Sequence, residues 1–190
     1  MTPVFTTERL DVRPWTHDDV EVAFDIYSRF EVARWLGAQP KVCESVEAMH
    51  GTIDRWAASS GSAGGPCGIW AVVPRATGVP VGTVLLVPLQ DGAGEPVAEI
   101  EVGWALHPDH WGRGLATEAA DGALARGWTA GLTETYAVVY PGNDPSVAVT
   151  QRLGMTALGR TKRWYGAELD AFWILRPEGR ADDVPPLAYG

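Results

Sequence analysis

A glycine-rich turn between a predicted strand and a predicted helix constrains this chain more than any other feature. The strand-like run VGWAL is followed by the loop HPDH, and WGRGLA then opens a helix predicted over Gly114–Thr129. The first N–H groups of a helix have no partner within it and lie at the positive end of its dipole. Gly112 and Gly114 let a ligand approach those groups closely, and Arg113 adds a permanent cation. The turn therefore predicts a pyrophosphate site.

Three interpretations of this turn compete: a tight helix entry, a dinucleotide site, and a cradle for another phosphate group. A dinucleotide site needs GxGxxG after an early strand of a βαβ unit. Here GRGLAT lacks the third glycine, and three predicted antiparallel strands precede it. The P-loop pattern GxxxxGK[ST] is absent. The helix entry and the other phosphate cradle therefore remain.

The predicted elements follow an order typical of an α+β fold with helices on a mainly antiparallel sheet. A strand over Arg9–Trp15 leads to two helices, capped by Thr16 and Ser45. The runs IWAVV, VGTVLLV and VAEIEVGWAL, separated by turn signals, predict an antiparallel meander. After the glycine-rich helix come the strand ETYAVVY, a short helix over Pro145–Leu153 and a last strand over about Asp170–Leu175.

Length and composition indicate one domain of ordinary globular type. We expect that domain over residues 1–176 of the 190, with a proline-rich tail over 177–190. The net charge of −9 argues against a nucleic-acid binder, which would need clustered lysine and arginine.

Cysteine usage and the absence of a signal pattern predict a cytoplasmic protein. Cys43 and Cys67 form no CxxC pair and are expected to be reduced thiols. No apolar run approaches ~20 residues, so no membrane span is expected. His107 and His110 lie three residues apart without a third ligand, so we expect no metal.

At this point the residues resemble a known family. LHPDHWGRGLATEA, followed by NDPSVAVTQRLGM, is similar to the GCN5-related N-acetyltransferases (GNAT), and more narrowly to their RimJ/RimL-like branch. TERLDVRPWTHDDV, EVARWLG and DAFWIL extend the resemblance over residues 6–176. The family loop pattern Q/R-x-x-G-x-G/A is met with Trp111, Gly114 and Ala116 at its first, fourth and sixth positions. The resemblance implies the GNAT fold, with a mixed, mainly antiparallel sheet flanked by helices.

The resemblance also implies which phosphate-bearing ligand the glycine-rich turn binds. It implies acetyl-CoA as co-substrate, without a metal, and a pyrophosphate held by the amides of one loop: Trp111, Gly112, Arg113, Gly114, Leu115, Ala116 and Thr117. The end of the preceding strand, Leu106 with His107, would pair through its backbone with the pantetheine arm. An N–H of Leu106 or a neighbour would polarise the acetyl carbonyl.

Acetyl transfer needs a neutral amine. A lysine-like amine with a pKa of ~10.4 costs about 4.6 kcal/mol to neutralise at pH 7, whereas an α-amine near ~8 costs about 1.4 kcal/mol. Glu99 and Glu101 share one face of a regular strand, and a bulge between them would separate their directions. In the resembled family a glutamate of this strand often takes the amine proton. Glu101 matches that position best and Glu99 second, with solvated or salt-bridged carboxylates as the alternative.

The thiolate that leaves needs a donor. Many family members use a tyrosine at the position where this chain has Thr150, and this branch instead resembles N-x-x-S, here Asn143 and Ser146. Ser146 would donate to the sulfur, unless it only satisfies the helix start. Asn143 would bind the pantetheine amide, unless it only forms the turn with Pro145.

The acceptor side is less defined. Trp15, Trp35 and Trp164 are candidates to line an acceptor pocket, with core packing as the alternative, and Glu99 is a second candidate contact. The segment Gly159–Glu168 is either a lip over the acceptor or a hairpin turn.

These inferences predict an acetyl-CoA-dependent N-acetyltransferase acting by direct transfer. The acceptor is a small-molecule amine or a protein N-terminal α-amine, and a homodimer is allowed. The alternatives are a non-catalytic acyl-CoA-binding module, which needs neither Glu101 nor Ser146, and an acyltransferase that uses another acyl-CoA.

Overall fold

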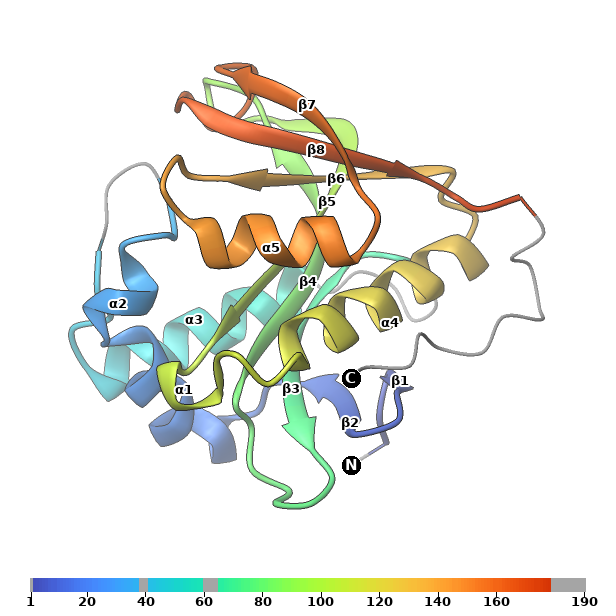
Figure 1. The fold of residues 1–190 in the computed structure, drawn as a ribbon. Helices are drawn as coiled ribbons and strands as arrows, with labels where there is room; N and C mark the ends of the chain where they lie inside the picture. The colour runs from blue at the N-terminus through green and yellow to red at the C-terminus, as the bar shows by residue number, and fades with distance from the viewer. Residues whose placement is uncertain (1, 38–40, 60–64, 179–190) are drawn as a thin grey trace.

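A sheet of eight strands runs through the molecule in the order β1-β2-β3-β4-β5-β6-β8-β7 (Figure 1). The computed structural model describes residues 2–37, 41–59 and 65–178. Neighbouring strands are antiparallel except for β5 and β6, which are parallel. The strands are β1 (Phe5–Thr6), β2 (Leu10–Pro14), β3 (Gly68–Pro74), β4 (Gly82–Gln90), β5 (Pro96–Leu106), β6 (Glu134–Val139), β7 (Thr156–Thr161) and β8 (Leu169–Leu175).

Helices cover both faces of this sheet (Figure 1). They are α1 (Val20–Tyr27), α2 (Phe30–Ala33), α3 (Val46–Ser59), α4 (Leu115–Thr129) and α5 (Asp144–Arg152), with short 3-10 turns η1 (His17–Asp19) and η2 (Pro108–His110). Helices α4 and α5 share a hydrophobic core with one face, whereas α1 and α3 pack on the other.

Strand alternation explains how one sheet serves two cores. Trp70 and Val72 of β3 belong to the core under α4, while Ala71 and Val73 belong to the core under α1 and α3. Successive side chains of a strand point to opposite faces, so a run that is apolar throughout, such as IWAVV, fits a strand covered on both sides.

The predicted fold class is confirmed, and so is the meander of β3, β4 and β5. One helix start differs by several residues: the helix expected directly after Thr16 starts as η1 and becomes α-helical only at Val20. Asp19 explains this start, because its Oδ2 accepts from the Thr16 N–H at 3.0 Å. The structure also contains β7, which the sequence analysis did not assign.

Two predicted segments fall partly outside the described residues. These are GSAGGPCG at 61–68, whose composition predicts a loop and of which 61–64 are not described, and the tail at 177–190, of which 179–190 are not described. Within the described ranges, no helix is long and apolar enough to cross a membrane.

Candidate active site

A large cleft opens where β5 and β6 separate. The two strands pair at one register position, Glu101 opposite Tyr136, whereas the pairing of β5 with β4 continues to Leu106. The cleft has a volume of about 1250 Å³, and β4, β5, β6, α5, the α2 segment and the loop before α4 contribute to its lining. A single small ligand usually occupies about 300–1,000 Å³. The cleft therefore has room for two substrates.

The loop before α4 forms one end of this cleft. Gly112 and Gly114 have φ values of 72° and 75°, a left-handed conformation that favours glycine. Gly114 is the N-cap of α4, and a Cβ built on Gly112 would meet no atom within 4 Å. The first intrahelical bond is donated by the Glu118 N–H to Gly114 O, so the amides of Leu115 to Thr117 precede it. These groups fit an anionic ligand.

One of the seven predicted loop amides is not available. The Trp111 N–H donates to Pro108 O at 3.0 Å, closing the short turn η2. The Trp111 indole also has a partner, since Nε1 donates to Leu106 O at 2.7 Å. The Trp111 N–H is therefore already paired within the loop, although Trp111 itself lines the cleft. The indole instead fastens the loop to the end of β5.

The backbone at the end of β5 bears on the predicted contact of His107 with pantetheine. The His107 N–H donates to Val81 O on the side of β4, and His107 is not among the residues that line the cleft. The His107 side chain is buried, with Nε2 3.1 Å from Asp25 Oδ2. Backbone groups alternate in direction along a strand, so those of Trp104 and Leu106 face the cleft. Leu106 O accepts from Trp111, so the Leu106 N–H and the backbone of Trp104 are the groups of this strand end that we expect to meet a ligand.

A buried ion pair beneath the loop was missed by sequence reasoning. Glu118 is fully buried in the first turns of α4, and Oε2 accepts from Arg9 Nε at 2.6 Å. Its Oε1 accepts from the Thr7 hydroxyl and the Arg9 N–H. Arg9 Nη1 donates to Arg113 O, and the Arg9 side chain lines the cleft. Two arginines from distant parts of the chain thus lie at the predicted phosphate end.

Replacing Glu118 with glutamine should destabilise the fold and loosen this end of the cleft. Loss of one partner of a buried charge pair costs several kcal/mol, and the 40% exposure of Arg9 reduces this to about 1–3 kcal/mol. Thermal unfolding measures the effect. Glu8→Gln, at the exposed neighbour of Arg9, is the control and should leave the unfolding free energy unchanged. Equal stability of Glu118→Gln and the control would contradict this description.

Glu101 lies in the wall of the cleft with its carboxylate held by the β7–β8 hairpin. Its Oε2 accepts from the Tyr165 hydroxyl at 2.6 Å. Burial raises the pKa of Glu101 to about 7, and the Tyr165 hydrogen bond opposes that rise. Burial also raises the pKa of Tyr140, and the charge of Glu101 adds to the effect. A carboxyl group with a pKa near 7 can accept a proton at neutral pH and release it again.

Glu99 has a different environment from Glu101. Its carboxylate forms an ion pair with Arg163, and it does not line the cleft. The register of β5 with β4 shifts between Pro88 and Gln90, opposite the segment that carries Glu99. The salt-bridged alternative therefore holds for Glu99. Its predicted contact with substrate is not supported.

Asn143 and Ser146, at the start of α5, have different roles. Asn143 is the N-cap, and its Oδ1 accepts from the Ser146 N–H at 3.3 Å. Ser146 lines the cleft, and Asn143 rather than Ser146 supplies the capping oxygen. Thr150 is fully buried and donates its hydroxyl to Val147 O. Ser146 is therefore the hydroxyl of this helix start that can act in the cleft.

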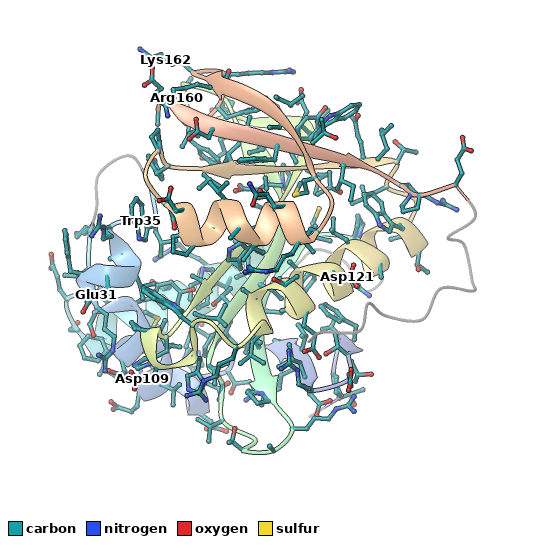
Figure 2. The ribbon with its side chains drawn as sticks, in the orientation of Figure 1. Glu31, Trp35, Asp109, Asp121, Arg160 and Lys162 are labelled. Carbon is teal, nitrogen blue, oxygen red and sulfur yellow. The ribbon has the colours of Figure 1, made fainter. Side chains whose placement is uncertain are left out.

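The three tryptophans predicted to line the acceptor pocket lie in different environments. Trp15 and Trp164 are buried in hydrophobic clusters, as their core alternative predicted. Trp35 lies after α2 and lines the cleft. Figure 2 shows Trp35 on the α2 side, and Arg160 at the end of the β7–β8 hairpin. The segment Gly159–Glu168 completes β7 and turns back toward β8, and its Tyr165 reaches Glu101.

Metal chemistry has no built site in the described part of the chain. No group of three or more histidine, cysteine, aspartate and glutamate side chains there could hold a metal ion.

Comparisons with known proteins agree with this geometry. Residues 9–156 match a family model described as acetyltransferase (GNAT) domain. An uncharacterized N-acetyltransferase, YoaA of Bacillus subtilis, is 28% identical over 165 residues, which cover 86% of this chain and 89% of that protein.

Solved structures share the fold. An acetyltransferase from Agrobacterium tumefaciens superposes with a TM-score of 0.73 at 25% identity, covering 93% of this chain and 96% of that one. Mycobacterium smegmatis RimJ in complex with CoA-disulfide gives a TM-score of 0.71 at 22% identity, covering 90% and 86%.

Proposed function

Because this chain belongs to the GNAT acetyltransferase family, we propose that it moves an acetyl group from acetyl-CoA to a primary amine by direct transfer in a ternary complex. The family model and the relative support the coarser statement that the chain is an acetyltransferase. The proposal of amine acetylation rests on one cleft. An amide-rich helix start lies at one end of this cleft, and Glu101, with its raised pKa, lies in its wall.

Acetyl-CoA binds with its pyrophosphate at the helix start. The amides of Gly112 to Thr117 and the Arg113 guanidinium match the charge of a pyrophosphate, and Arg9, which is paired with Glu118, supports the loop by donating to Arg113 O. Asn143 and the cleft-facing backbone of β5 hold the pantetheine arm. The CoA disulfide in the related RimJ structure supports this choice of ligand.

Transfer begins when Glu101 accepts a proton from the ammonium group of the acceptor. The neutral nitrogen then attacks the thioester carbon, the C–S bond breaks, and an amide forms. Ser146 donates a hydrogen bond to the sulfur as it leaves. As the amide forms, the nitrogen loses a second proton, which goes to the thiolate, and the proton held by Glu101 is released to solvent, which restores the carboxylate. The cleft-facing N–H groups of Trp104 and Leu106 polarise the carbonyl.

The acceptor is a small-molecule amine or a protein N-terminus, and neither needs a nucleic acid or a membrane. The two alternatives predict different results. A binding module would take up acetyl-CoA without releasing thiol, whereas an enzyme for another acyl group would turn over longer acyl-CoAs faster.

An amine panel tests the proposal. Acetyl-CoA should raise the melting temperature by mass action, whereas NAD should not. With acetyl-CoA present, at least one primary amine among N-terminal peptides, polyamines, aminoglycosides and arylalkylamines should release free thiol. Thermal stabilisation without thiol release from any amine would favour the binding module.

Replacing Gly114 with valine should weaken acetyl-CoA binding about ten- to a hundredfold, because a side chain there obstructs charged hydrogen bonds at the helix start. The left-handed backbone also strains any β-branched residue by about 1–2 kcal/mol.

Gly131→Val is the matched control for this strain. Gly131 has a φ of 97° just beyond the other end of α4, with no atom within 4 Å of a built Cβ. Calorimetric titration of both folded variants should show weaker acetyl-CoA binding only for Gly114→Val. Equal affinities would mean that the pyrophosphate binds elsewhere.

A further inference from the structure

A small chamber adjoins the cleft at Glu101. It has a volume of about 240 Å³, and its walls include Trp35, Glu101, Val138, Tyr140, Tyr165 and Leu169. Four of these residues, Trp35, Glu101, Val138 and Tyr140, also line the large cleft. The chamber and the cleft therefore meet at the Glu101 carboxylate.

We propose that this chamber is the acceptor subsite and that it takes a primary amine carried on one apolar, ring-sized group without a second positive charge. The inference rests on the proposed function, and it narrows the acceptor from any amine to a class. Three properties of the chamber lead to it: its charge, the orientation of Glu101, and its size.

The charge of the chamber suits one ammonium group and no more. Among its described lining residues, Glu101 has the single carboxylate. Tyr140 and Tyr165 both have a raised pKa, mainly through burial, and stay neutral at pH 7. A second ammonium group buried here would lack a counter-ion, which is unfavourable.

Charges outside the chamber do not change this. Glu99 is paired with Arg163, and the Arg34 guanidinium lies over the Trp35 ring, 4.3 Å from its centroid. Glu31 of α2 lines the large cleft but not the chamber. A polyamine that entered would therefore bring its second cation near Arg34 on this side.

The Tyr165 hydroxyl fixes how Glu101 faces the chamber. Tyr165 has a φ of 57°, the one positive value outside glycine in the described chain. Such a backbone costs about 1–2 kcal/mol, and a bond from the Tyr165 N–H to Gln90 O at 2.9 Å holds it. The hydroxyl donates to Glu101 Oε2, and within residues 2–37, 41–59 and 65–178 no hydrogen bond reaches Oε1. Oε1 is thus left for the amine.

The size of the chamber limits the group that carries the amine. At about 240 Å³ it lies below the usual range of about 300–1,000 Å³ for drug-sized ligands. It accommodates one ring or branched chain, and Trp35 and Tyr140 are among its walls. A peptide would have to continue out of the chamber after its first residue.

Three acceptors test the proposal directly: 2-phenylethylamine, spermidine and a peptide with an N-terminal alanine. With wild-type protein and saturating acetyl-CoA, kcat/KM for 2-phenylethylamine should exceed the other two values at least about tenfold. Trp35→Ala should raise KM for 2-phenylethylamine about tenfold or more. The control Phe30→Ala removes an exposed aromatic of α2 that lines neither cavity, and it should change nothing.

Tyr165→Phe adds a readout that a purely structural role would not change. Loss of the hydroxyl removes the hydrogen bond that lowers the pKa of Glu101, so the acidic limb of the kcat/KM profile should move to higher pH. If the acidic limb does not move in folded Tyr165→Phe, the proposed orientation of Glu101 by Tyr165 is wrong. A preference for spermidine or for the peptide would overturn the acceptor class while leaving acetyl transfer intact. Absence of thiol release with all three amines and with the wider panel would instead overturn the proposed function, and this inference with it.

Discussion

Replacing Glu101 with glutamine should lower kcat/KM about a hundred- to ten-thousandfold at neutral pH, the range expected for loss of a positioned general base. The amide cannot accept the ammonium proton, yet it keeps the size of the side chain and can still accept from Tyr165. Affinity for acetyl-CoA should stay nearly unchanged, since Glu101 lies away from the predicted phosphate end.

The direction in which activity changes with pH follows from the pKa of Glu101. Glu101 acts as a base only when ionised, and its pKa is raised to about 7. Activity of the wild type should therefore fall as the pH drops below 7, with a further limb set by the amine itself. Glu101→Gln should lose the limb near pH 7 and recover activity as the pH approaches the pKa of the acceptor.

Glu99→Gln is the matched control, because Glu99 lies two residues away on the same strand and is paired with Arg163. It should keep the wild-type pH profile. Full activity of Glu101→Gln at every pH, or a larger loss in Glu99→Gln, would transfer the role of base from Glu101 to Glu99 or to water.

Replacing Ser146 with alanine should lower kcat about ten- to a thousandfold, with the smaller loss expected if water takes the place of the hydroxyl. The effect should fall on kcat because the hydrogen bond to sulfur strengthens as negative charge develops there. The melting temperature should hardly change, since Asn143 rather than Ser146 caps α5.

Steady-state kinetics with a validated acceptor measure this loss, and a single-turnover experiment shows whether it lies in the chemical step. An unchanged rate in Ser146→Ala would mean that the thiolate leaves without help from this hydroxyl. If Glu101→Gln were also fully active, positioning of the two substrates alone would account for the reaction.

Much of the fold could be predicted because its signals are local. The meander strands are bounded by turn residues, and the glycines before α4 have the left-handed backbone that their position required. Strand β7 could not be found this way. It lies at the edge of the sheet and is exposed along nearly its whole length, so its sequence TALGRT lacks the alternation that marks a half-buried strand.

In the candidate site, too, only the features with local sequence signals could be predicted. The phosphate loop was predictable because its glycines, arginine and helix start are consecutive. Arg9 and Glu118 are 109 residues apart, and Tyr165 and Glu101 are 64 apart. Only the packed sheet brings such pairs together. The hydrogen bonds of the Trp111 and His107 amides were likewise hidden, because they depend on the turn η2 and on the register of β5 with β4.

The most direct test of the central claim follows the acetyl group itself. Acetyl-CoA labelled with ¹³C at the acetyl carbonyl is mixed with the protein and a primary amine, and the carbonyl signal is followed by NMR. We predict that the thioester signal is replaced by an amide signal of the acetylated amine, one amide for each thiol released, and that Glu101→Gln slows this conversion. A thioester signal that shifts on binding but never becomes an amide, with any amine of the panel, would contradict the account.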